Sequence, residues 1–208
     1  MSLSTSRLAA LVVAASFAAG LNVYATVATL GILARTGAIE LPASLDPLTN
    51  WWVIGASVAL YAVEFVADKI PAIDLVWNAL QTFVRIPVAA LMAYAATARL
   101  SAADQLMAAV LGGCIALIAH GGKTAVRVAV TPSPEPFSNI ALSAGEDVLA
   151  VLISWLAGRH PYWAAAIAAV LLTIIVILGR AVMRAIRAAF GGAARQFARF
   201  GTGQAHSP

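Results

Sequence analysis

Hydrophobic residues occupy this chain in long blocks that are almost free of charge, without the one-sided stripe typical of soluble helices. Most blocks reach about 20 residues or more, the length that a helix needs to cross a hydrocarbon core about 30 Å thick. We therefore expect an all-α fold, a polytopic membrane helix bundle, with residues 1–182 forming a single transmembrane domain. The blocks predict six spanning helices, over Leu8–Ala34, Trp51–Ala67, Ala72–Ala98, Ala102–Val130, Phe137–Ala157 and Tyr162–Val182.

The first block admits a second interpretation. Arg7 followed by apolar residues up to Ala19 also matches the charged and apolar regions of a signal peptide. The run continues to Ala34 without a charge, which is longer than a cleavable signal normally allows and favours a spanning helix. Six spans also divide into two groups of three, so a 3+3 inverted repeat with halves 8–98 and 102–182 is compatible with the pattern.

Composition agrees with a membrane location. Of the 208 residues, 62% are hydrophobic and 11% are charged, whereas soluble domains carry roughly a quarter of charged residues. The single cysteine, Cys114, excludes an intrachain disulfide, and we expect it to be a small core residue.

Positive charge predicts the orientation, because short cytoplasmic loops collect Lys and Arg. The segment 36–50 holds Glu40 and Asp46 without a positive residue, while Lys69 and the C-terminal arginines fall on the other predicted side. This count places both termini in the cytoplasm, although Arg99 and Arg159 fall on the outer side.

The C-terminal residues 183–208 are expected to form a basic amphipathic cytoplasmic tail. Its arginines recur near helical spacing and predict a basic face that lies on anionic lipid headgroups, with a plain topology anchor as the alternative. These arginines, counted with one just before the tail, are Arg180, Arg184, Arg187, Arg195 and Arg199. A homo-oligomer remains open, and no nucleic-acid partner is expected.

Ionisable residues inside the apolar blocks are the candidate functional groups, because a charge in a bilayer is costly unless it is paired or reaches water. Glu64 and Asp68 share one helix face. A polar stripe follows at intervals of four, three and four residues, formed by Asp74, Asn78, Gln81 and Arg85.

The second half carries basic residues at helical spacing, followed by polar and acidic ones. The basic positions are His120, Lys123 or Thr124, and Arg127, and the later positions are Asn139, Ser143, Glu146 and Asp147. Five acids (Glu64, Asp68, Asp74, Glu146, Asp147) stand against four bases (Lys69, Arg85, Lys123, Arg127). Pairing in the bundle interior is therefore the expected arrangement, and a purely structural role or a place at the interface is the alternative.

Sharper motifs are lacking. Gly121-Gly122-Lys123-Thr124 resembles the end of a phosphate-binding loop, but Leu117 stands where that motif needs its first glycine. The sequence has no H-E-x-x-H and no G-x-S-x-G, so we expect no catalytic residues, no metal, no cofactor and no enzyme activity.

Several of these segments together resemble a known family. They are Gly20 to Thr26, the phrase E-F-V-A-D-K-I-P from Glu64 to Pro71 with Asp74, Arg85 with Pro87, His120 to Lys123, and Asn139 to Asp147. Over about residues 15–175 the chain resembles the bacterial membrane family catalogued as domain of unknown function 4126. The resemblance implies a multi-pass protein of the bacterial inner (plasma) membrane and supplies no activity.

The leading hypothesis is a small transporter or channel-like protein for an ion, a proton-coupled solute or an anionic lipid headgroup. The alternative is a structural or partner-binding membrane subunit in which the charges only pair. An intramembrane enzyme would need neighbours such as Glu146 and Asp147 to bind a metal together, and they point about 100° apart on a helix. The candidate path residues are Asn22, Tyr24, Glu64, Asp68, Lys69, Asp74, Gln81, Arg85, His120, Lys123, Arg127, Asn139, Ser143, Glu146 and Asp147.

Overall fold

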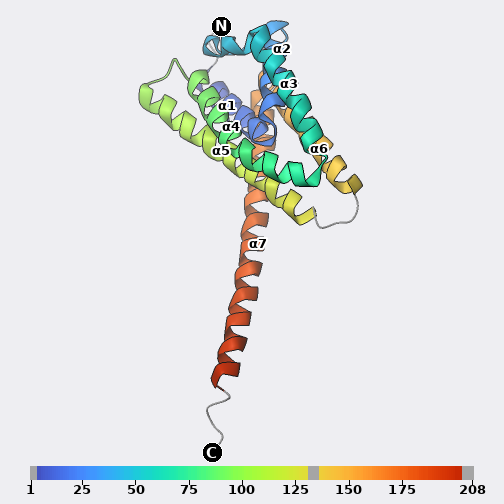
Figure 1. The fold of residues 1–208 in the computed structure, drawn as a ribbon. Coiled ribbons are helices and arrows are strands. Elements are labelled where there is room, and N and C mark those ends of the chain that lie inside the picture. The colour runs from blue at the N-terminus through green and yellow to red at the C-terminus, as the bar shows by residue number, and fades with distance from the viewer. Residues whose placement is uncertain (1–3, 131–135, 203–208) are drawn as a thin grey trace, which may run out of the picture.

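The computed structural model describes residues 4–130 and 136–202, and the regular elements among them are helices. Figure 1 shows α1 in the middle of the bundle, with α7 running past it and projecting beyond the other helices. The proline-containing segment 131–135 lies outside the described residues. In chain order the elements are α1 (Thr5–Leu21), α2 (Val23–Arg35), the 3-10 helix η1 (Ala43–Thr49), α3 (Trp51–Ala67), α4 (Pro71–Ala96), α5 (Ala102–Val130), α6 (Pro136–Arg159) and α7 (Pro161–Thr202).

Within residues 4–130 and 136–202, four helices are long and apolar enough to cross a membrane, and a fifth span results if η1 and α3, which meet at 61°, count as one. Large apolar side chains such as Leu106, Val110 and Val170 are more than half exposed on the outside of the bundle, as lipid contact requires. These findings confirm the all-α membrane bundle, whereas the count of six spans is not confirmed.

The first hydrophobic block is where the structure departs from the expected helix. It divides at Asn22, whose backbone is extended, with φ −152° and ψ 104°. The Asn22 side-chain oxygen accepts a hydrogen bond from the backbone N–H of Ala25 at 2.9 Å and so caps α2. Asparagine is among the preferred N-cap residues, which explains why the chain ends one helix and starts another here.

The two short helices form a hairpin that returns to the end of the bundle where it began. Ser6, at the start of α1, and Tyr162, at the start of α7, share a hydrogen bond of 2.9 Å between their hydroxyls. Just after α2, the carbonyl of Ala38 accepts a hydrogen bond from Arg159, at the end of α6, at 2.8 Å. We call this the upper end, and the hairpin of α1 and α2 is therefore re-entrant.

The remaining helices cross between the upper end and the opposite, lower end. The helices α3 and α4 run down and back, since the hydroxyl of Ser44, in η1 just before α3, donates to the carbonyl of Ala95 near the end of α4. Residues 8–98 then contribute two crossings, and α5, α6 and α7 contribute three. The 3+3 inverted repeat is accordingly not confirmed.

The structure does not show the predicted cytoplasmic location of both termini. The chain starts α1 at the upper end, while α7 starts there and leaves at the lower end (Figure 1). The charge count assumed that the first block crosses the membrane once, and the turn at Asn22 removes that crossing. The two ends of the described chain therefore lie at opposite ends of the bundle.

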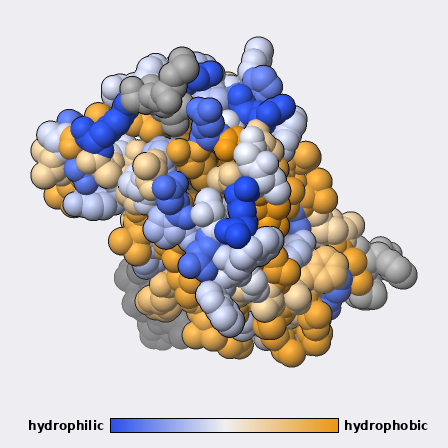
Figure 2. Space-filling model, turned by 90° about the horizontal axis from the view of Figure 1, so that it is seen from above, coloured by the Kyte–Doolittle hydropathy of each residue, from blue (hydrophilic) through white to orange (hydrophobic). Residues whose placement is uncertain are grey.

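Aromatic side chains mark the upper end as a boundary between lipid and water. Trp51 and Trp52 open α3, Tyr162 and Trp163 open α7, and all four are more than half exposed. Trp and Tyr favour the headgroup level of a bilayer, where their rings are half in lipid and half in water. Figure 2, which views the molecule from above, shows hydrophilic residues on this end and hydrophobic ones around its sides.

Close packing around α1 depends on small residues. A side chain at Gly20 would come within 2.6 Å of the Ala116 carbonyl oxygen on α5, so the two backbones can approach only because Gly20 has no Cβ. Cys114, on the same helix α5, is exposed on the outside of the bundle, so the expectation that it is a core residue is wrong.

Candidate functional site: a buried charge cluster at a helix break

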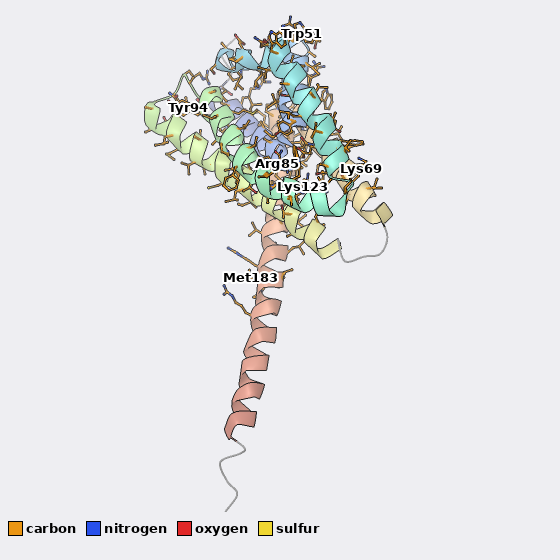
Figure 3. All side chains as sticks on the ribbon, in the orientation of Figure 1. Trp51, Lys69, Arg85, Tyr94, Lys123 and Met183 are labelled. Atoms are coloured by element: carbon orange, nitrogen blue, oxygen red, sulfur yellow. The ribbon has the colours of Figure 1, made fainter. Side chains whose placement is uncertain are left out.

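Six ionisable side chains from four helices meet, among the described residues, inside the lower half of the bundle. Figure 3 shows Arg85 and Lys123 close together there, with Trp51 at the upper end and Lys69 farther out. The members of this charge cluster are Glu64, Asp68, Arg85, Lys123, Arg127 and Glu146. Their side chains are almost completely buried, and that of Glu146, at 11% exposure, is the most accessible.

Lys123 of α5 stands at the centre of the charge cluster. Its Nζ lies 3.6 Å from Oε1 of Glu64, 3.4 Å from Oδ2 of Asp68 and 3.3 Å from Oε2 of Glu146. One ammonium group thus bridges the end of α3 to α6.

Two guanidinium groups complete the pairing. Arg85 of α4 binds Oε1 of Glu64, while Nη2 of Arg127 lies 2.8 Å from Asp68 and 2.6 Å from Glu146. The Ser143 hydroxyl also donates to Oδ2 of Asp68 at 3.3 Å. Buried ions remain charged only when partners replace their lost hydration, and this arrangement supplies such partners.

The helix break at Asn22 is part of the same network. The carbonyl of Gly20 accepts from Nη1 of Arg85 and that of Leu21 accepts from Nζ of Lys123, both at 3.3 Å. Carbonyls in the last turn of a helix lack intrahelical partners and carry the negative end of its dipole. On the other side of the break, Nδ2 of Asn22 donates to Oδ1 of Asp147 at 2.9 Å.

His120 of α5 contacts Arg85 and the backbone of α4, and these neighbours fix its tautomer. Its Nδ1 lies 3.0 Å from Nη1 of Arg85, which can only donate. Its Nε2 lies 3.1 Å from the backbone carbonyl of Asn78, which can only accept, and 2.9 Å from the Thr82 hydroxyl. His120 is therefore neutral, with its proton on Nε2, and it orients Arg85 without adding a charge.

The other predicted path residues divide into those near the charge cluster and those elsewhere. Gln81 donates to the hydroxyl of Tyr24 at 3.1 Å, beside the hairpin. Lys69 turns away, since its Nζ bonds the carbonyl of Phe65 and lies over that ring. The side chains of Asp74 and Asn139 lie outside the described residues.

Sequence reasoning missed the part that the backbone plays. The carbonyls of Gly20 and Leu21 act as ligands because the helix stops, and hydropathy gave no sign of a stop within a continuous apolar run. The available signal was Asn22 itself, a polar residue with a strong N-cap preference. Thr82 was also missed, since a lone threonine in a helix usually bonds its own backbone.

Three buried polar atoms in the charge cluster have no hydrogen-bond partner among the described residues, namely Oε2 of Glu64, Oδ1 of Asp68 and Nε of Arg85. Such atoms are costly in a dry interior and suit a proton, a water molecule or a small ion. Within the described part of the chain, no group of three or more His, Cys, Asp or Glu residues is arranged to hold a metal ion.

A separate pocket of about 430 Å³ opens at the upper end. Polar and ionisable groups from three segments line it, including Arg7, Glu40, Arg159 and His160. The core residues Leu11, Phe17 and Leu21 of α1 are buried between this pocket and the charge cluster. The described conformation is thus closed between the two.

The comparisons with known proteins gave one result. A family model described as "Domain of unknown function (DUF4126)" matches residues 9–181. No curated protein and no solved structure matches the chain.

Proposed function

We propose that this chain, which belongs to the family described as domain of unknown function 4126, is a small transporter or channel-like membrane protein. Its charge cluster would bind an ion, a proton-coupled solute or an anionic headgroup. The observation that carries the proposal is the helix break at Asn22, whose flanking backbone carbonyls bind Arg85 and Lys123. Broken helices beside buried charges are how many transporters build a site inside the bilayer.

The mixture of charges is suited to binding and release. Each cation of the charge cluster bonds more than one acceptor. A ligand can therefore take the place of one acceptor, or a proton can neutralise it, while the others hold the side chain. Glu146 is the most exposed member and would provide the route from the lower end. The upper pocket would be the opposite entrance in a second conformation.

A structural or partner-binding subunit is the second candidate. It is favoured by the completeness of the pairing, since Arg85, Lys123 and Arg127 each contact a carboxylate in the closed bundle. In that case the charge cluster would lock α3, α4, α5 and α6 together and nothing would move.

A matched pair of lysine variants separates the two candidates. In proteoliposomes with an internal pH dye and an imposed potassium diffusion potential, Lys123→Met should abolish the flux of protons or ions, because its ammonium holds three acids together. Lys69→Met should keep the wild-type flux, because Lys69 points away from the charge cluster.

Glu146→Gln provides a variant with a lower risk of misfolding, since its side chain is partly exposed, and it should reduce the flux as well. A wild type without flux of any tested ion, together with variants that only melt at lower temperature, would favour the structural role.

We further propose that the C-terminal end faces the cytoplasm of a bacterial inner membrane and the start of α1 faces the opposite side. The lower end carries the arginines of α7, whose charge favours the cytoplasm. Arg180 and Arg184 lie about 29 and 35 Å along α7 from Pro161, at 1.5 Å per residue, near the far side of a hydrocarbon core about 30 Å thick. They would contact anionic headgroups there.

Cysteine labelling tests this orientation. In a Cys114→Ala background, Ser4→Cys and Arg187→Cys should react with a membrane-impermeant maleimide from opposite sides, because both positions are exposed and α1 and α2 form a re-entrant hairpin. Labelling of both from the same side would mean that the first block crosses the membrane.

A further inference from the structure

Asp147 differs from the acids of the charge cluster in having no cation as a close partner. It follows Glu146 on α6, and its side chain is buried, at 3% exposure. Glu64, Asp68 and Glu146 each lie within ion-pair distance of Lys or Arg nitrogens. Asp147 has no such contact within the part of the chain that the structure describes.

The charges of the cluster balance without Asp147. Among the described side chains, three cations, Arg85, Lys123 and Arg127, face three paired acids, Glu64, Asp68 and Glu146. An ionised Asp147 would add one negative charge to a buried region, and an unpaired buried charge is strongly destabilising. The neutral acid is the form that the surroundings favour.

The hydrogen bonds of Asp147 indicate where a proton would sit. Nδ2 of Asn22 is a donor, so Oδ1 of Asp147 accepts and stays unprotonated. The other oxygen, Oδ2, is buried and makes no hydrogen bond of normal geometry within the described part of the chain, and the Tyr61 hydroxyl is a polar group near this carboxyl. We propose that Asp147 is the proton-binding group of this site, that it carries the proton on Oδ2, and that losing it makes Asp147 compete with the paired acids for Lys123.

This inference rests on the proposed function and names the proton as the bound species. Lys123 is the cation among the groups that face Asp147, so it would answer a new negative charge there by leaving Glu64, Asp68 or Glu146. Between Trp163 and Arg180, α7 carries no ionisable residue. The facing groups are Asn22 at the helix break, Tyr61, Glu64 and Asp68 on the α3 side, Lys123 on α5 and Glu146 on α6.

Because Asn22 ends α1 and caps α2, the same proton would also act on the hairpin. A carboxylate on Asp147 would hold the Asn22 amide more strongly than a neutral acid does. At the same moment, movement of Lys123 would release the carbonyl of Leu21 at the end of α1. Proton loss would thus change the contacts on both sides of the break.

Infrared difference spectroscopy of the reconstituted full chain can test this. The wild type should show the carbonyl stretch of a protonated carboxyl group at neutral pH, and the band should disappear as the pH is raised. Asp147→Asn should lack the band, since the amide keeps the size of the side chain and the oxygen that accepts from Asn22. Glu146→Gln should keep it.

A second variant preserves the test if Asp147→Asn does not fold. Asn22→Ala removes the donor to Oδ1 and should shift the frequency of the band without abolishing it. A wild type without the band, or a band that neither variant changes, would overturn the inference.

Proton flux in the same proteoliposomes distinguishes the two proposals. The expected band without wild-type flux would leave Asp147 as a proton site and refute transport. Wild-type flux that Asp147→Asn does not alter would support transport and refute the role of Asp147.

Discussion

Arg85→Met is expected to destabilise the protein more than any other single substitution of an ionisable residue in the bundle. Arg85 is completely buried and contacts Glu64, which is also completely buried. Removing one partner of a buried ion pair costs about 3–5 kcal/mol, because the other charge loses its closest partner, here with Lys123 left 3.6 Å from Glu64. At about 2–4 °C per kcal/mol for a chain of this size, the melting temperature in detergent should fall by about 6–20 °C.

The paired and exposed controls make this result specific. Arg99→Met removes an exposed arginine after the same helix and should leave the melting temperature almost unchanged. The double variant Glu64→Gln with Arg85→Met should recover part of the loss, since it also removes the carboxylate that the single variant leaves without its arginine. Equal melting of Arg85→Met and Arg99→Met would show that the pair does not stabilise the bundle.

Gly20→Ala should have the second large effect, although it adds a single methyl group. Its Cβ would stand 2.6 Å from the carbonyl oxygen of Ala116 and 2.8 Å from Cβ of Ala119, so α1 and α5 must move apart. Overpacking of this kind typically costs about 1–3 kcal/mol. The movement would also lengthen the 3.3 Å hydrogen bond from Arg85 to the Gly20 carbonyl and loosen the charge cluster.

Gly121→Ala is the matched control, the same substitution in a helix where no atom lies within 4 Å of the added carbon. It should raise stability by about 0.8–1 kcal/mol through helix propensity alone. Thermal unfolding of both variants in one detergent would then give changes of opposite sign. A loss of stability in both would mean that the α1 and α5 contact is not special.

Much of the fold follows from the sequence, because the length of an apolar block and the position of prolines act locally. The start of α4 at Pro71 and that of α6 at Pro136 lie within one residue of the predicted ones. The re-entrant hairpin does not follow, because its apolar block is long enough to span and hydropathy averages over Asn22. A single side chain, which caps α2, determines that the first block turns back within the bundle and does not cross it.

The candidate site was predicted in composition better than in geometry. Helical spacing placed Glu64 with Asp68 and Lys123 with Arg127, and the structure brings these four together. Spacing could not show that Lys69, one position after Asp68, lies beyond the end of α3 and turns outward. It also could not show that Asp147 pairs with an amide from the first block, since that contact joins positions 125 residues apart.

The central position of α1 has a consequence for how the protein is made. This helix leaves the ribosome before α4, α5, α6 and α7, which surround it. Contacts between distant parts of a chain form slowly, because the long loop between them must close, at a cost in entropy, before the contacts can stabilise the fold. The hairpin can therefore make these contacts only after the later helices have been synthesised.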